Sequence, residues 1–196
     1  ITHRVGSLKL TSGGIKTDPS LMAILKQAAG DRRIFLAAST HEGEDLSVIR
    51  AAQALGNEWF TLLAPRHPKR GATIAALCQD HIPGAKAPTR RALGQTPATG
   101  EVIHIVDTLG EMGSLFAIAD VVFMGGSLLP IGGHNPLEPA QFGLPVICGP
   151  HLAKNQAEFD KYLKLAMDRN KQEKLESFVR NLRYSFDTDE VFNDAL

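Results

Sequence analysis

Five short apolar runs alternate with amphipathic stretches along this chain, and this alternation constrains the fold more than any other feature. The runs occupy residues 34–38, 59–64, 102–106, 121–124 and 146–148. They are apolar throughout, which is typical of parallel strands covered by helices on both faces. The sequence therefore predicts an α/β fold with a doubly wound, Rossmann-like parallel sheet.

Helical spacing of apolar residues predicts the segments between these strands. Helices are expected over residues 19–29, 45–55, 70–79 and 108–119, with at most one short edge strand within 82–100. Three divisions of the chain follow. Residues 1–14, which end in Ser-Gly-Gly, read as an interdomain connector, residues 15–155 as one Rossmann-like α/β domain, and residues 156–196 as a helical tail.

Charge and cysteine content exclude several classes of protein. The 196 residues hold 21 Lys and Arg against 21 Asp and Glu, so general affinity for nucleic acid is not expected. Cys78 and Cys148 fall in a helix and a strand, which favours buried thiols over a bridge.

No apolar run approaches the roughly 20 residues that cross a bilayer, so we expect a soluble polypeptide. The first ten residues read like the end of a preceding segment, so we expect a fragment of a longer protein.

Four unusual loops follow predicted strands directly, and parallel sheets bind ligands at the carboxyl ends of their strands. We therefore expect these loops to lie along one edge and to form one site. They are residues 39–44, 65–68, 107–111 and 125–138.

The fourth loop is the strongest candidate for an anion site. It holds four glycines and ends in a predicted helix start, where Asn135 is a good N-cap, Pro136 suits the first position, and Glu138 can reach back to the N–H of the cap. Free N–H groups at a helix start favour phosphate, and the Glu138 carboxylate can accept hydrogen bonds from a ribose. The alternative is a well-capped helix that binds nothing.

Other polar residues in these loops suit a nucleotide better than a metal or a nucleophile. Arg66 offers a planar fork of donors to phosphate, with a surface ion pair as the alternative. Leu109, Gly110 and Glu111 are expected to begin a helix whose N–H groups can meet a base or a second anion, with simple capping as the alternative. Histidines 41, 67 and 134 lack the close spacing of a metal motif. The (i, i+2) glutamates at 42 and 44 are expected to stabilise the next helix. The loops contain neither G-x-G-x-x-G nor a P-loop, and no catalytic triad is indicated.

Several motifs of this chain resemble those of one enzyme family. AASTHEGED, LAPRHP, DTLGEM and FMGGSLLPIGGHNPLEPAQFGLPVICGPH resemble the C-terminal domain of bacterial 3-deoxy-D-manno-octulosonic acid (Kdo) transferases of lipopolysaccharide synthesis, and VGSLKL resembles the connector that precedes it. The resemblance covers about residues 5–150 and fades after 155. The family often has Met at the position of Leu109.

The resemblance implies the C-terminal, donor-binding domain of an inverting GT-B glycosyltransferase, with CMP-Kdo as donor, a lipid A precursor as acceptor, and no cofactor or metal. By motif, the implied nucleotide-binding residues are Pro65, Arg66, Leu109, Gly110, Glu111, Asn135, Pro136, Leu137 and Glu138. Candidate contacts to the rest of the donor are Ser39, His41, Glu42, Gly126, Ser127 and His134.

The resemblance also implies what this chain lacks. The family's general base is a glutamate of the N-terminal domain, so no catalytic residue is expected here and the fragment should be inactive alone. The full-length protein is expected at the cytoplasmic face of the bacterial inner membrane. Two alternatives stay open, an epimerase-like nucleotide-sugar domain, which would favour UDP, and a non-catalytic nucleotide-binding module.

Overall fold

The computed structural model describes residues 15–82, 84 and 87–157. The predicted connector and almost all of the predicted helical tail lie outside this part of the chain. In chain order the elements are α1 (Pro19–Ala29), β1 (Arg33–Thr40), α2 (Asp45–Leu55), β2 (Trp59–Pro65), α3 (Gly71–His81), β3 (Thr89–Arg90), β4 (Ile103–Ile105), α4 (Met112–Ile118), β5 (Val121–Met124), α5 (Leu137–Gln141) and β6 (Val146–Ile147), with 3-10 turns at Gly56–Glu58, Pro68–Arg70 and Arg91–Leu93.

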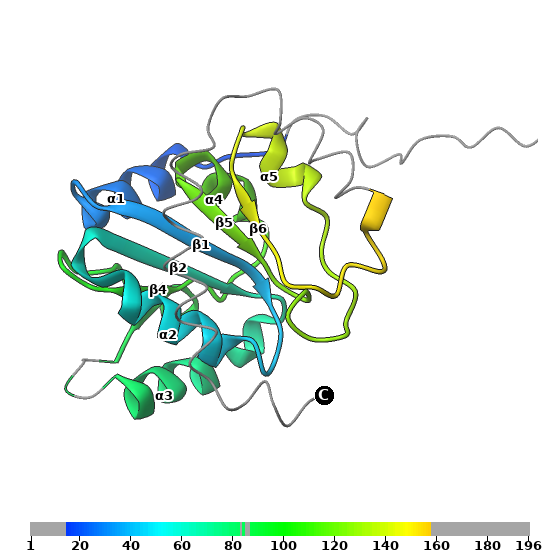
Figure 1. Ribbon diagram of the computed structural model, residues 1–196. Helices are drawn as coiled ribbons and strands as arrows, with labels where there is room; N and C mark the ends of the chain where they lie inside the picture. Colours follow the sequence, from blue (N-terminus) through cyan, green and yellow to red (C-terminus); the bar gives the residue numbers. More distant parts are fainter. Residues whose placement is uncertain (1–14, 83, 85–86, 158–196) are drawn as a thin grey trace, which may run out of the picture.

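The described strands form one sheet in the order β3-β4-β2-β1-β5-β6, and every pair is parallel. The arrowheads of β1, β2 and β5 therefore point to the same side of the molecule (Figure 1). From β1 the chain adds β2 and then the edge strand β3 on one side, places β4 between β3 and β2, and then crosses back to place β5 on the other side of β1. This reversal between β1 and β5 is the point at which doubly wound sheets bind ligands.

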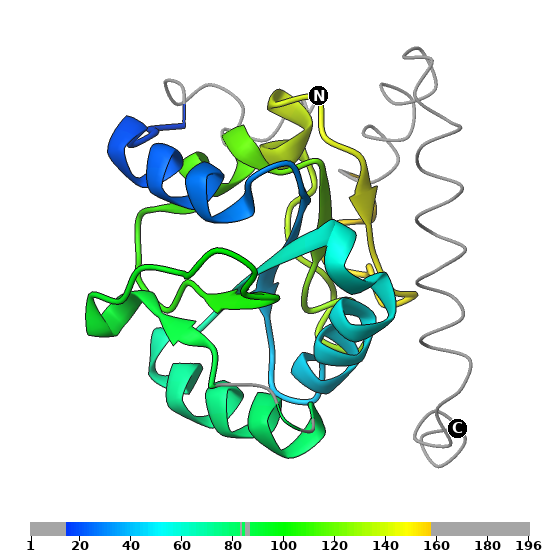
Figure 2. The same cartoon turned by 90° about the vertical axis from the view of Figure 1, so that its left-hand side faces the viewer.

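Helices cover both faces of the sheet, which confirms the predicted doubly wound fold. Leu36 and Ala38 of β1 face α1 and α4 in one buried cluster, while Phe35 and Ala37 face α2 and α3 in the other. Figure 2 shows α1 on one side of the sheet and α2 and α3 on the opposite side. Because both faces are buried, the strands are apolar at nearly every position, and this is the pattern that the sequence displays.

Most predicted elements are present with ends shifted by one or two residues, and β3 is the single edge strand expected within 82–100. The helix predicted to open at Thr108 is the exception. α4 begins at Met112, because Gly110 has φ +83° and so takes a left-handed conformation that an α-helix does not contain. Leu109, Gly110 and Glu111 therefore form a loop before the helix and not its first turn.

The helix predicted after Asn135 is short. The Asn135 side chain accepts a hydrogen bond from the N–H of Leu137 at 3.0 Å, but the residue at the N-cap position is Pro136 and not Asn135 as predicted, and α5 ends after five residues. A single turn has a small dipole, so any attraction of an anion to this segment comes mainly from individual N–H groups. None of the described helices has the length and apolarity that a bilayer crossing requires.

Candidate functional site

Three of the four predicted loops meet in one pocket at the carboxyl edge of the sheet. The pocket encloses about 130 Å³, and its lining comes from the ends of β1, β2 and β4 and from the start of α4. Its lining residues are Ser39, Ala64, Pro65, Arg66, Val106, Thr108, Leu109, Gly110, Glu111, Met112 and Leu115. Residues far apart in sequence share this edge because all the strands are parallel, as the sequence predicted.

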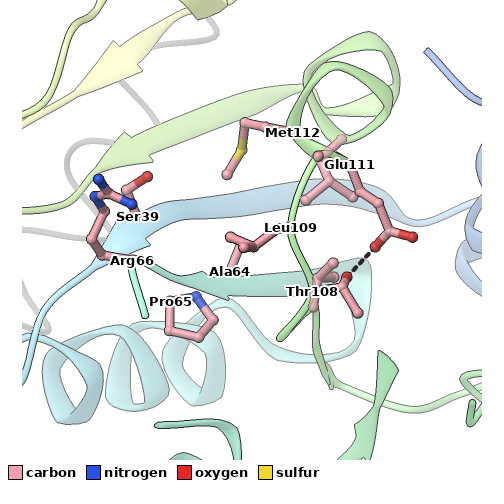
Figure 3. Close-up of a pocket in the computed structure, with 11 residues that line it drawn as sticks. Ser39, Ala64, Pro65, Arg66, Thr108, Leu109, Glu111 and Met112 are labelled. Carbon is pink, nitrogen blue, oxygen red and sulfur yellow. Dashed lines mark hydrogen bonds between the residues drawn. The ribbon is translucent and has the colours of Figure 1, made fainter. Parts of the chain in front are cut away.

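The pocket has a cationic end and an apolar floor. Figure 3 shows Arg66 beside Ser39 on one side of the view and Thr108 with Glu111 on the other, with Met112 and Leu109 between them. Arg66 is exposed, and its backbone N–H donates to the carbonyl of Thr40 at 3.0 Å, which ties the end of β2 to β1. With a cation at one end and apolar side chains across the middle, the pocket suits a ligand that joins a flat ring to an anionic group.

Ser39 is held in an unusual conformation at the pocket wall. Its φ of +57° makes it the non-glycine residue with a left-handed backbone among those described, and the register of β1 against β2 shifts at this point. Gly125 packs directly against it, since a Cβ at Gly125 would lie 2.4 Å from the carbonyl oxygen of Ser39. Such strain persists only where neighbouring contacts enforce it, and it is common at ligand sites.

Two arginines that the sequence reading did not single out hold the loop after β4. Arg90 donates through Nε (2.9 Å) and Nη2 (2.7 Å) to the buried carboxylate of Asp107, which also accepts from the N–H of Ala92 at 2.8 Å. Arg91 pairs with Glu111 at 2.9 Å. Nothing in the local sequence marks these pairings, because the partners are 17 and 20 residues apart and meet only when β3 joins β4.

The carboxylate of Glu111 is engaged within the chain. It binds Arg91 and accepts a hydrogen bond from the hydroxyl of Thr108, so it does not cap the helix by reaching back to a backbone N–H as a capping box would. Leu109 is 76% exposed at the rim. This loop can therefore offer backbone groups and an apolar side chain to a ligand, while the acidic side chain shapes the loop.

Glu44 lies next to the start of α2 as predicted, but its carboxylate has a role that the sequence did not predict. The sequence reading assigned it to the start of α2, but its fully buried carboxylate instead accepts four backbone N–H groups: those of His41 (2.8 Å), Gly126 (2.7 Å), Ser127 (2.9 Å) and Leu128 (2.9 Å). It thereby ties the loop after β1 to the loop after β5. Exposed Glu42, by contrast, has no hydrogen bond or ion pair among the described residues.

The fourth loop lies against its own chain and not around the pocket. Ser127 is fully buried, its hydroxyl donating to the carbonyl of Met124 and accepting the N–H of Gly149, so it holds the loop and is not exposed to a donor. A Cβ at Gly132 would lie 2.6 Å from the Lys154 side chain. This glycine therefore allows close packing within the chain, which corrects the expectation that the whole glycine loop is shaped for a ligand.

Two histidines from different loops meet where the sheet order reverses. The Nε2 atoms of His41 and His134 lie 2.8 Å apart with the rings stacked at 10°, and the ring of His67 lies 6.0 Å from that of His41, edge to face. Burial lowers the pKa of His41, and burial together with the positive field of His41 and Arg66 lowers the pKa of His134 to about 4. The pair is therefore neutral near pH 7, with one ring donating and the other accepting.

The remaining predicted nucleotide contacts lie outside the pocket wall. Pro136 and Leu137 are buried, and Glu138 is exposed on α5. No group of three potential metal ligands occurs within residues 15–157 as far as the structure describes them. What the edge offers is a cation, apolar walls and N–H donors, which can bind an anionic ligand.

These features define a class of protein. A doubly wound parallel sheet with its site at the carboxyl edge is the architecture of Rossmann-like nucleotide-binding domains, including the C-terminal domains of GT-B glycosyltransferases. The structure resembles the crystal structure of the C-terminal CMP-Kdo binding domain of WaaA from Acinetobacter baumannii, with a TM-score of 0.59 and 26% identity over 84% of this chain and 98% of that chain.

Sequence comparison identifies the relatives more closely. The chain is 39% identical over 135 residues to the 3-deoxy-D-manno-octulosonic acid transferase of Haemophilus influenzae and 40% identical over 130 residues to that of Bordetella pertussis. These matches cover 67% and 63% of this chain and 30% of each relative, so the chain spans about a third or less of the relatives' length. No protein-family model matches the chain. By sequence and fold the chain is a relative of the Kdo transferases and a counterpart of such a C-terminal domain.

Proposed function

We propose that this chain is the CMP-Kdo-binding half of an inverting glycosyltransferase that transfers Kdo to a lipid A precursor. The observation that carries the proposal is the pocket at the carboxyl edge, in a chain whose structural neighbour is named as a CMP-Kdo binding domain. Its volume of about 130 Å³ is below the roughly 300 Å³ of a complete ligand pocket. A pocket of this size suits one wall of a cleft that a second domain closes.

In this proposal the nucleotide lies across the pocket. Pro65 and the backbone of Leu109 and Gly110 contact the base, and Arg66 binds the phosphate as a planar donor. The side chain of Glu111 keeps the loop in shape through Arg91. The phosphate and ribose also meet the segment Asn135, Pro136, Leu137 and Glu138, which belongs to the loop after β5 and the start of α5.

The chemistry assigned to the whole enzyme is direct displacement at the anomeric carbon. An acceptor hydroxyl, deprotonated by a carboxylate of an N-terminal domain, attacks while Arg66 stabilises the negative charge that develops on the departing CMP phosphate. No cofactor or metal is required, since the cation at the leaving group is a side chain. As part of the same proposal, the full-length enzyme acts at the cytoplasmic face of the inner membrane, where its lipid acceptor resides.

The two alternatives are not favoured. The relatives described above are named as transferases, and the structural neighbour is named as a CMP-Kdo binding domain, whereas an epimerase-like domain would favour UDP. A non-catalytic module would be distinguished by the coding sequence that surrounds this segment.

The direct test is to titrate this polypeptide with CMP, UMP and AMP, and to measure binding by calorimetry and by amide NMR. We expect CMP to bind most tightly and to shift the signals of Arg66, Gly110 and Asn135. Selective binding of UMP would refute the assignment of the donor.

A single substitution probes the ribose contact. Glu138→Gln should weaken CMP binding by about 1–3 kcal/mol if the carboxylate holds the ribose, because hydrogen bonds to charged groups are in that range. An unchanged affinity would return Glu138 to a purely structural role.

A further inference from the structure

Three imidazoles from three strand-end loops gather at the reversal of the sheet order. His41 follows β1, His67 follows β2 and His134 lies in the loop after β5. The Nε2 atoms of His41 and His134 are 2.8 Å apart, and the ring of His67 meets that of His41 edge to face. Topology alone brings these side chains together, since His134 is 93 residues from His41.

The imidazole pair stands on two loops that share one buried anchor. The Glu44 carboxylate binds the backbone N–H of His41 and those of Gly126, Ser127 and Leu128, so a single buried group fixes both loops. A Cβ at Gly126 would lie 3.2 Å from the His134 ring, so this glycine leaves room for the pair. Loops anchored in this way lose little conformational entropy when a ligand binds.

The surroundings of the pair favour an anion. Arg66 acts electrostatically on both rings, Arg70 on His41 and Lys154 on His134, and Glu44 is the opposing carboxylate. In the described part of the chain, no carboxylate forms an ion pair with any of the three imidazoles, because that of Glu44 is saturated by backbone N–H groups.

The pair adjoins the pocket proposed for the nucleotide. Ser39, two residues before His41, and Arg66, next to His67, both line that pocket. In a 2-ulosonic acid the carboxyl group is bonded to the same carbon that carries the phosphate in the activated sugar. A phosphate bound at Arg66 therefore brings the carboxylate of the sugar within reach of a second, neighbouring anion receptor.

We propose that His41 and His134 form the subsite that receives the carboxylate of the donor's acid sugar, with exposed His67 at its mouth. This assignment rests on the proposed function, because it requires a nucleotide-activated acid sugar in the adjoining pocket. In the free protein one Nε2–H donates to the other Nε2. When the accepting ring changes tautomer, from Nδ1–H to Nε2–H, both Nε2 atoms carry a proton. The two rings then separate so that each Nε2–H donates to the carboxylate, with no net uptake of a proton.

The test compares CMP with CMP-Kdo on the wild-type chain and on His41→Leu, His134→Leu and His81→Leu, by calorimetry. Glu44 holds His41 through its backbone, so the substitutions at the pair leave that anchor in place. His81 is exposed at the end of α3 and serves as the matched control. We expect the wild type and the control to bind CMP-Kdo at least about tenfold more tightly than CMP, which is the range of a hydrogen bond to a charged group. The two variants at the pair should lose this preference while their affinity for CMP stays within about twofold.

A conservative variant and a spectroscopic readout complete the test. His134→Gln, whose amide can donate one hydrogen bond, should retain part of the preference. The Nε2 signals of His41 and His134 should shift with CMP-Kdo and not with CMP. Thermal unfolding of each variant identifies any that fails to fold, in which case the Gln variant and the wild-type NMR titration decide.

Each other outcome overturns an identifiable part of the reasoning. Failure of the wild type to bind CMP refutes the proposed function. A wild type that binds CMP and CMP-Kdo equally, or variants that keep the full preference, refutes the carboxylate subsite alone. If the two Leu variants at the pair bind CMP much more weakly than the wild type does, the imidazoles contact the phosphate and not the carboxylate.

Discussion

Replacement of Glu44 tests the central structural claim about the site, that one buried carboxylate joins the loops after β1 and β5. Glu44 is fully buried and accepts four backbone N–H groups at 2.7–2.9 Å, with Oε2 serving His41 and Gly126 and Oε1 serving Ser127 and Leu128. Glu44→Gln keeps the shape and one oxygen acceptor. It turns an NH₂ group toward at least two N–H donors, which are then left without an acceptor.

The magnitude follows from those two donors. A buried donor that loses its partner costs about 1–3 kcal/mol, so two of them destabilise the fold by about 4 kcal/mol. For a domain of this size, with about 2–4 °C per kcal/mol, the midpoint of thermal unfolding should fall by about 8–16 °C. Urea unfolding gives the free energy directly, and hydrogen exchange should show faster exchange first at Gly126, Ser127 and Leu128.

Glu42→Gln is the matched control, since Glu42 is exposed, lies two residues away and carries the same charge. Its stability should stay within about 0.5 kcal/mol of the wild type. A loss below about 1 kcal/mol for Glu44→Gln, or equal losses for the two variants, would refute the view that this carboxylate anchors the loops.

Three further results are expected. Arg90→Met should destabilise the fold by about 3–5 kcal/mol in urea unfolding, because it leaves the buried Asp107 carboxylate without its cation, and adding Asp107→Asn should recover part of that loss if the pairing is the cause. The pKa of His134 is lowered to about 4, so the unfolded chain binds a proton at higher pH than the folded one. The free energy of unfolding should therefore fall by about 2 kcal/mol between pH 6.5 and pH 4. His134→Gln should flatten this pH dependence. Gly125→Ala should cost about 1–3 kcal/mol and weaken CMP binding, because its Cβ would lie 2.4 Å from the carbonyl oxygen of Ser39 at the pocket wall. Unchanged CMP affinity would show that the Ser39 conformation is unimportant to the site.

The sequence by itself determined the sheet and the edge that carries the site. Continuous apolar runs such as residues 121–124 identify strands buried on both faces, and helical spacing between them requires parallel crossovers. These two facts place every loop that follows a strand on one edge, which is why Pro65, Arg66 and the residues 109–111 could be assigned to one pocket before the fold was known. Local signals also placed a helix start next to Asn135, whose side chain accepts the N–H of Leu137, although the N-cap position falls on Pro136.

Only the tertiary structure decided what individual polar groups do within that edge. Glu44 has the sequence context of a helix-start residue, and Glu111 that of a capping box, yet each carboxylate binds partners supplied by another loop. The pairing of His41 with His134 and of Arg90 with Asp107 likewise depends on which strands become neighbours. Periodicity and capping rules report on contacts within a few residues, whereas a buried charge takes its partner from whatever the fold packs against it. For this reason the location of the site followed from the sequence, and its internal bonding required the structure.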